Sequence, residues 1–378
     1  MSALPLVLTL LCSTPATARH RDPPPAPVQP PVQIIYKYVD PPPEPPSPVV
    51  DYTPDLMELW KLVSGDGTLD ALESEFRRGW LSIAMPFFKT IVPATAPKTV
   101  VYPFGGGDLV SALAVFPDAT DITTISLEPA GEAAAMFRGG GAGRRMEQIR
   151  KDVGFLLHVA FSKTESMGSL ADEDIPAQIL FSLMAQAVHG FTPTGLKYFK
   201  LMPDGKVHYY TQKDLKDAAT VKNTHVFDDC EITFKRGNEP ERVHRHIYID
   251  LSDARFLKDP VLAKFLDTKG RVSAMTKACS YLLWEDAFSK IREYLLTHAD
   301  WMVSDATGIP PHVARAAGYE QETYGNFTAA ILKVDHDVLD EFRELWKKQP
   351  RRKLAFRFGY PNHGSGEGHL MITRPKAH

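Results

Sequence analysis

The stretch TVVYPFGGGDLVSALAVFPDATDITTISLEPAG, residues 99–131, most constrains the fold of this chain. Residues 99–104 are rich in β-branched and aromatic side chains and predict a short buried strand. Three glycines then allow a tight turn, residues 108–116 predict an apolar helix, and residues 122–127 predict a second strand. Two strands joined through a helix form a crossover unit, which requires the strands to pair in parallel.

Downstream of this unit, the sequence alternates between helical and extended patterns. A nearly all-apolar helix is predicted over residues 175–188, and strands are predicted over residues 272–277 and 301–304. Between them, LKYFKLMPDGKVHYYT and CEITFKRGNEPERVHRHIYIDL each alternate around turn residues, which is typical of β-hairpins. The chain closes with LAFRFGY and HLMIT, which we expect to pair as a final hairpin.

These elements predict one fold class. Alternating strands and helices favour a three-layer, Rossmann-like α/β domain over residues 51–378, with a mostly parallel sheet. The β-hairpins form an insertion near residues 191–250 of that domain. The alternative is that the hairpins form a second, small domain over residues 191–243.

The N-terminal segment predicts an exported chain. LPLVLTLLC, followed by the small residues of Ala16-Thr17-Ala18, predicts a signal peptide over residues 1–18. Residues 19–50 contain PPPAPVQPPVQ and DPPPEPPSP, which favour an extended polyproline conformation without a core. We therefore expect a periplasmic or envelope-associated protein whose folded domain follows a proline-rich linker.

Charge and hydropathy narrow the choice of partner. The formal net charge is -3, from 43 basic and 46 acidic residues, so the chain has no basic excess with which to bind a nucleic acid. No apolar run reaches the roughly 18–20 residues of a membrane-spanning helix. We expect neither nucleic-acid binding nor a transmembrane span, and consider a small-molecule ligand or an envelope protein as the partner.

The glycine turn carries the first candidate site. Gly105, Gly106, Gly107 and Asp108 follow a predicted strand and open a helix, where backbone N–H groups can face a bound cofactor. Glu128 ends the next strand, at the position where Rossmann-type units bind ribose hydroxyls through an acid. A tight turn and an ordinary loop acid explain the same residues without a ligand.

This pattern resembles the first two motifs of class I S-adenosylmethionine-dependent methyltransferases. The resemblance spans only the crossover unit, and it departs from the family just before the glycines, where Tyr102-Pro103-Phe104 stands in place of an acidic residue. It implies a methyltransferase-like scaffold and, as cofactor, S-adenosylmethionine or a nucleotide-type ligand.

A longer pattern resembles a family of bacterial exported proteins and lipoproteins. YPFGGGD, LEPAG, TKACSYLL and SDATGIPP correspond to YPFSGPD, LEPVG, KAASYLL and DDSGIP in that family. The resemblance runs from Tyr102 to Tyr360, which is most of the predicted folded part. It implies export and does not imply an activity.

Lys277 and Asp305 are candidate catalytic residues. Both follow predicted strands, and open α/β sheets bind their ligands at the carboxyl ends of the strands. We therefore expect them to face the same crevice as Gly106 and Glu128. The alternative is that Lys277 is an ion-pair or surface residue and that Asp305 caps a turn.

His244 and His246 are candidate metal ligands. They lie on one face of a predicted strand, with a spacing that can chelate a metal ion. No complete ligand set follows from the sequence, and the alternative is an exposed polar face of the hairpin. For Cys230 and Cys279, spacing alone does not decide between a disulfide and two small buried residues.

We interpret the chain as an exported, envelope-associated protein that binds a small ligand or a protein partner near Gly105–Asp108 and Glu128. A methyltransferase-like enzyme is the alternative, and an interaction module built on the hairpins is a third. No G-x-S-x-G, P-loop or H-E-x-x-H motif is present, which argues against the commonest hydrolases, NTPases and zinc proteases. The sequence leaves open whether the chain is an enzyme.

Overall fold

The computed structural model describes residues 46–65, 73–138, 143–147, 175–221, 225–277, 279–327, 336–359 and 368–376. The chain from Ser47 to His378 folds as a single unit. The predicted signal peptide and nearly all of the predicted proline-rich linker lie outside the described residues.

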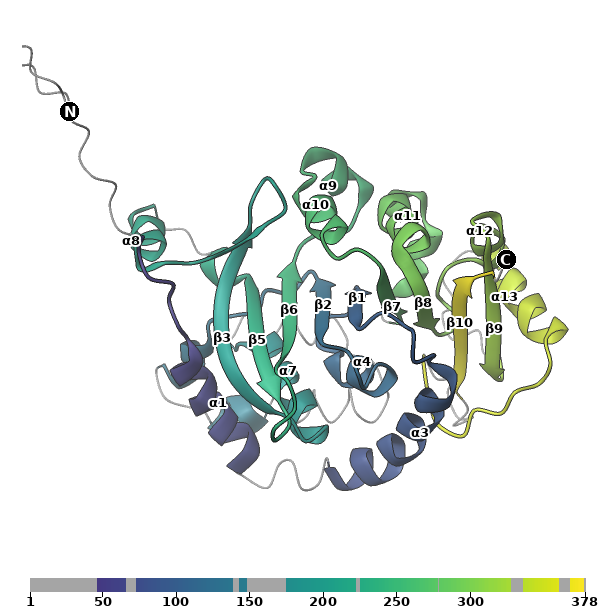
Figure 1. Ribbon diagram of the computed structural model, residues 1–378, viewed down its shortest axis with the longest axis horizontal. Coiled ribbons are helices and arrows are strands. Elements are labelled where there is room, and N and C mark those ends of the chain that lie inside the picture. Colours follow the sequence, from purple (N-terminus) through teal and green to yellow (C-terminus); the bar gives the residue numbers. More distant parts are fainter. Residues whose placement is uncertain are drawn as a thin grey trace, which may run out of the picture. The chain divides into compact units, whose positions relative to one another are not determined.

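Ten strands in the described part of the chain form a single sheet (Figure 1). They are β1 (Thr99–Pro103), β2 (Asp121–Ser126), β3 (Thr192–Leu201), β4 (Val207–Tyr209), β5 (Asp229–Lys235), β6 (Arg242–Tyr248), β7 (Val272–Thr276), β8 (Ala299–Ser304), β9 (Tyr319–Gly325) and β10 (His369–Pro375). Their order along the sheet is β4-β3-β5-β6-β2-β1-β7-β8-β10-β9. The central strands from β6 to β8 are parallel to one another, and the remaining pairs at both ends are antiparallel.

The sheet is therefore mixed rather than mostly parallel, and its order is not purely that of a Rossmann sheet. Both predicted hairpins are present, because β3 pairs with β4 and β5 pairs with β6. However, β6 also pairs in parallel with β2. The hairpins thus continue the central sheet, because strands of both also pair outside their own hairpin.

The predicted crossover unit is confirmed. β1 and β2 pair in parallel, from Thr99 opposite Asp121 to Pro103 opposite Ile125, and α4 (Leu109–Val115) connects them. Every residue of α4 is buried, as its nearly all-apolar composition requires.

Helices cover both faces of the sheet (Figure 1). In the described residues they are α1 (Thr53–Gly65), η1 (Glu73–Leu81), α3 (Ser82–Ile91), α4, η2 (Ala133–Phe137), α7 (Ala177–Val188), α8 (Gln212–Thr220), η3 (His225–Phe227), α9 (Asp253–Lys258), α10 (Val261–Asp267), η4 (Ser280–Trp284), η5 (Asp286–Phe288), α11 (Ser289–His298), α12 (Pro311–Ala316) and α13 (His336–Lys348). One hydrophobic core joins a sheet face to α1, α3, α4 and α7, and a second joins the other face to α10, α11 and α12. None of the described helices is both long and apolar enough to cross a bilayer.

Strand alternation decides which side chains enter which core. In β1, Val100 and Tyr102 belong to the core with α7, whereas Val101 belongs to the core with α10 and α11. In the same way, His244 and His246 of β6 lie opposite Ile122 and Thr124 of β2. Because Ile122 belongs to the core with α7, both histidines lie on the face that α7 covers.

The predicted C-terminal hairpin is only half present. HLMIT lies in β10, but residues 354–359 of the LAFRFGY segment form no strand. β10 pairs antiparallel with β8 on one edge and with β9 on the other, so both of its edges are already occupied. Phe356 and Phe358 instead pack their rings against Phe88.

Candidate functional site

The glycine turn after β1 is closely packed rather than open. Gly105, Gly106, Gly107 and Asp108 are all buried. A Cβ atom on Gly105 would lie 2.7 Å from the ring of Tyr102, and one on Gly107 would lie 2.9 Å from the ring of Phe181 in α7. These two glycines are therefore required by the close approach of neighbouring side chains, and the turn presents no open backbone surface.

A buried ion pair closes the turn. The Nζ atom of Lys277, which directly follows β7, lies 2.7 Å from Oδ2 of Asp108 and 3.0 Å from Oγ of Ser111. The phenol of Tyr102 donates to the same Asp108 carboxylate at 2.8 Å. Lys277 is 2% exposed and Asp108 is 1% exposed. The segments that follow β1 and β7 are thus joined by charge and hydrogen bonding.

Asp305, which directly follows β8, is also buried and engaged. Its Oδ1 atom accepts hydrogen bonds from the backbone N–H of Thr307 at 2.8 Å and from the Thr307 hydroxyl. The Thr307 hydroxyl lies 2.6 Å from Oγ of Ser280, and Oδ2 of Asp305 lies 4.0 Å from Nε2 of His369. Asp305 therefore stabilises the turn after β8. This agrees with the alternative interpretation, in which Asp305 caps a turn.

Glu128 differs from these residues in what its side chain contacts. It is 8% exposed, its backbone N–H donates to Oγ of Ser126 at 3.3 Å, and its carbonyl oxygen lies 2.7 Å from Nε2 of His246. Its carboxylate makes no hydrogen bond or ion pair with any residue that the structure describes. A fixed backbone thus holds a carboxylate that is still able to accept hydrogen bonds.

His244 and His246 are buried, so the alternative of an exposed polar hairpin face is wrong. Nε2 of His244 lies 2.9 Å from the Thr124 hydroxyl, and its Nδ1 lies 3.0 Å from the Ser182 hydroxyl in α7. Nδ1 of His246 lies 3.3 Å from the same Thr124 hydroxyl, and its Nε2 contacts the Glu128 carbonyl. All four ring nitrogens therefore have a protein partner.

Burial keeps both imidazoles neutral. Desolvation, together with the repulsion that a protonated His244 would have with a protonated His246 and with Arg245, lowers the pKa of His244 to about 3. Desolvation lowers the pKa of His246 to about 4, against a smaller opposing effect of its hydrogen bond to Glu128. A neutral imidazole has one donor nitrogen and one acceptor nitrogen, so the direction of each hydrogen bond can be assigned.

The assignment starts at Glu128, whose carbonyl oxygen can only accept. Nε2 of His246 therefore donates to it, and Nδ1 accepts from the Thr124 hydroxyl. Thr124 then accepts from Nε2 of His244, whose Nδ1 accepts from the Ser182 hydroxyl. The result is a directed chain of hydrogen bonds that runs from α7 through the sheet to the peptide group of Glu128.

The described residues provide no further ligands for a metal ion at His244 and His246. Among the described residues, no group of three or more His, Cys, Asp or Glu side chains is arranged to hold a metal ion. Cys230 and Cys279 are not joined in a disulfide, and burial raises the pKa of the Cys230 thiol above its usual value. His244 and His246 act within the directed hydrogen-bond chain instead.

Two exposed side chains lie near the ends of β2 and β6: Leu127 precedes Glu128 in the chain, and Tyr248 ends β6. Leu127 is 60% exposed, and Tyr248, at the end of β6, is 38% exposed. The register of the two strands places Tyr248 opposite Ser126, next to Leu127. We refer to Leu127, Glu128 and Tyr248 together as the β2–β6 edge.

The structure therefore brings most of the predicted residues together in two separate groups, whereas Asp305 pairs with Thr307. Lys277 contacts Asp108, and His246 contacts Glu128, but no hydrogen bond or ion pair joins Lys277 to Glu128 among the described residues. Sequence reasoning missed Tyr102, Thr124 and Ser182, which hold these groups in place. The polar Ser182 within a mostly apolar helix was a sequence signal that could have indicated a buried partner.

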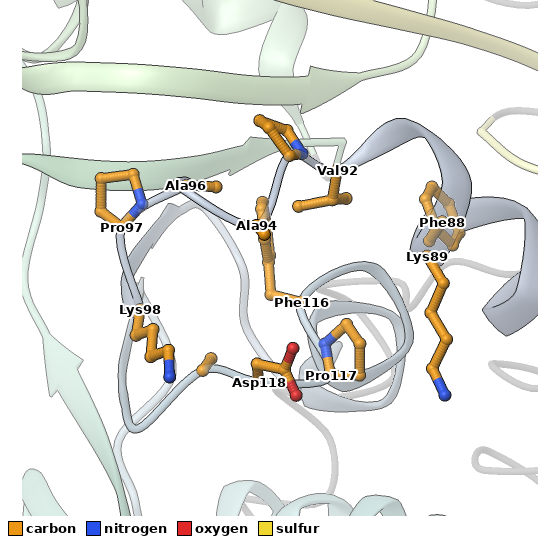
Figure 2. A pocket seen from close by; sticks show the side chains of 12 residues that line it. Phe88, Lys89, Val92, Ala94, Ala96, Pro97, Lys98, Phe116, Pro117 and Asp118 are labelled. Carbon is orange, nitrogen blue, oxygen red and sulfur yellow. The ribbon is translucent and has the colours of Figure 1, made fainter.

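A hollow of about 180 Å³ lies at the other edge of the central strands (Figure 2). Pro97 and Lys98, which precede β1, and Asp118, which precedes β2, are among its lining residues. It is thus at the amino-terminal edge, whereas ligands of open α/β sheets bind beyond the carboxyl ends of the strands. We do not include it in the candidate site.

Comparisons of the chain with protein-family models, with curated proteins and with solved structures found no match.

Proposed function

We propose that this chain is an exported protein that binds a nucleoside-type ligand without phosphate groups, such as S-adenosylmethionine or a related adenosine derivative, at the β2–β6 edge. The observation that carries the proposal is the Glu128 carboxylate, which is 8% exposed and has no partner among the described residues. Two ribose hydroxyls can donate to it, as in other Rossmann-type units. The base of such a ligand would pack on the exposed side chain of Leu127, which precedes Glu128, or of Tyr248, which ends β6.

The order of the parallel strands supports this proposal. Numbered by their sequence along the chain, β6-β2-β1-β7-β8 follow the order 3-2-1-4-5, which begins the doubly wound Rossmann order. The antiparallel β10 and then β9 follow in place of a parallel sixth strand.

The glycine turn argues against a phosphate group on the ligand. Asp108 already accepts a hydrogen bond from the backbone N–H of Ser111 at the start of α4, and Lys277 neutralises the Asp108 carboxylate. A phosphate would have to displace a carboxylate that is 1% exposed. A ligand whose polar part is a ribose and whose tail is uncharged or zwitterionic avoids this cost.

Binding without catalysis is favoured over methyl transfer. Lys277 and Asp305, the candidate catalytic residues, are buried and already paired within the protein. The predicted signal peptide and proline-rich linker support a location in the periplasm or cell envelope. A protein partner that covers Leu127 and Tyr248 is the alternative occupant of the same edge.

A thermal-shift titration of the full chain tests the ligand class. S-adenosylhomocysteine, S-adenosylmethionine and adenosine should raise the melting temperature in a saturable way, because a ligand that binds the folded state stabilises it. ADP and ATP should give smaller shifts at equal concentration. A flat response to all five compounds, or larger shifts with ADP and ATP, would contradict the proposal.

A further inference from the structure

A second candidate site lies at the far end of the sheet, between the edge strand β9 and α13. A hollow of about 500 Å³ opens here, within the size range of small-molecule sites. Within the described part of the chain, its lining contains the cationic side chains Arg343, Lys347, Arg351 and Arg352 and no carboxylate. Figure 1 shows α13 beside β9 and β10, well away from β2. The site is therefore independent of the β2–β6 edge.

The local sequence explains why cations collect at this place. Arg343 and Lys347 are four positions apart in α13 and so lie on one face of the helix. α13 ends at Lys348, within the run KKQPRRK of residues 347–353. This run contains five of the 43 basic residues of the chain, whose net charge is -3. Basic residues at a helix C-terminus also complement its dipole, which accounts for Lys347 and Lys348 but not for the arginines beyond the helix.

Arg352 lines the hollow and has several partners. Its Nη1 atom donates to the carbonyl oxygen of Thr323 at 3.3 Å and to Oε1 of Gln349 at 3.1 Å, and its Nε atom lies 3.1 Å from a Glu322 carboxylate oxygen. Its carbonyl oxygen accepts from the backbone N–H of Gly325 at 2.9 Å. One cation is thus fixed by β9 itself.

The other cations are exposed and weakly engaged. Arg343 pairs with Asp340, and Lys347 pairs with Glu344 at 3.3 Å. Both are pairs between exposed side chains, which contribute about 0–1 kcal/mol and exchange readily for a stronger anion. Arg351 donates to the amide oxygen of Asn326 at 3.2 Å, which is a neutral acceptor.

Two aromatic rings complete the lining. Phe327 and Trp346 lie 5.8 Å apart between ring centroids, and the Arg343 guanidinium lies 5.7 Å from the Phe327 ring centroid. Stacking of guanidinium groups on rings keeps their planar donor edges available for an oxyanion. We propose that this hollow binds a compact ligand that carries two or more oxyanion groups, either phosphate or carboxylate.

Isothermal titration calorimetry of the full chain with pyrophosphate, citrate and acetate tests this assignment. We expect saturable binding of pyrophosphate or citrate that weakens as salt is added, and no saturable binding of acetate. Tighter binding of pyrophosphate would identify a phosphate ligand, and tighter binding of citrate would identify a carboxylate ligand. Absence of saturation with both, or acetate binding as tightly as either, would overturn the assignment.

A pair of double variants separates this site from general surface charge. Arg343→Gln with Arg351→Gln removes two exposed charges from the lining and should weaken binding at least about tenfold, since each lost hydrogen bond is to a charged group. Lys235→Gln with Lys258→Gln removes two exposed charges elsewhere and should leave the affinity unchanged. Equal effects of the two double variants, or no effect of the first, would overturn the proposal. Because all four substituted side chains are exposed, both proteins should fold.

Discussion

Nε2 of His246 donates to the backbone carbonyl of Glu128 across 2.7 Å, although the two residues are 118 positions apart in the chain. The same imidazole is fixed from its other side by Thr124. The position of Glu128 therefore depends on the interior of the sheet and not only on its own loop. This relationship links the two histidines that the sequence suggested as metal ligands to the acid that it suggested as a ligand-binding residue.

Replacement of His246 by leucine should destabilise the protein. It leaves the Glu128 carbonyl and the Thr124 hydroxyl without this buried partner, at a cost of about 1–3 kcal/mol for each group. Urea denaturation should show a loss in this range or above, whereas His225→Leu, at an exposed histidine, should change the stability by less than about 0.5 kcal/mol. Equal effects of the two substitutions would contradict a structural role for His246.

The protein should be less stable in mild acid because its buried histidines, among them His244, His246 and His189, resist protonation. Desolvation lowers the pKa of His244 to about 3 and the pKa values of His246 and His189 to about 4, from an ordinary value of 6.5. As the pH falls below 6.5, only the unfolded chain gains these protons, and the loss levels off below the folded pKa values. From pH 7 to pH 5 each histidine should remove about 2 kcal/mol of stability. Stability that rises over this interval would contradict the assignment.

Protonation of Asp229 should partly offset the loss of stability that the histidines cause in mild acid. Burial raises its pKa to about 7, and its carboxylate accepts from the backbone N–H of Tyr248 at 2.8 Å. Above pH 3.8 the unfolded chain releases this proton while the folded chain retains it up to about pH 7, so Asp229 lowers stability as the pH rises through that window. The Asp229→Asn variant lacks this effect and should lose about 2 kcal/mol more than the wild type between pH 7 and pH 5. Parallel pH profiles for the two proteins would refute it.

Loss of Lys277 alone should destabilise the protein more than loss of both charges of its ion pair with Asp108. Lys277→Met leaves a buried carboxylate without its cation and should cost about 3–5 kcal/mol, and adding Asp108→Asn should restore part of that loss. The control is Lys61→Met, which breaks an exposed pair with Glu58 and should cost less than about 1 kcal/mol. Chemical denaturation of the wild type and these three variants decides the question, and a double variant less stable than Lys277→Met would contradict it.

Local patterns were sufficient to predict the crossover unit. The strand, turn and helix of residues 99–127 depend on β-branched runs, three glycines and one apolar helix, all of which are short-range features. The same reasoning missed β9, since YEQETYG is a polar edge strand with no apolar alternation strong enough to indicate it. It also predicted a strand for LAFRFGY, whose alternating Phe356 and Phe358 bury their rings against Phe88 without pairing in the sheet.

The positions of Glu128 and Lys277 at strand ends could be predicted, but their partners could not. Glu128 and Lys277 were predicted because each follows a strand, and the carboxyl ends of parallel strands meet at one edge of a sheet. The bond between Lys277 and Asp108 spans 169 positions, and no periodicity indicates which neighbour a buried cation will select. The burial of His244 and His246 could not be predicted, because the sequence does not reveal that β6 has β2 as a second neighbour.

The most direct test of the proposed ligand site is calorimetric titration of S-adenosylhomocysteine into the full chain, its Glu128→Gln variant and its Glu239→Gln variant. Glu239 is the matched control, because it lies in the turn before β6, at the opposite end of that strand, and pairs with Arg242. We predict saturable binding to the wild type and to Glu239→Gln, and an affinity at least about tenfold lower for Glu128→Gln, since a hydrogen bond to a charged group is lost. Undiminished binding to Glu128→Gln would show that the ligand does not use this carboxylate.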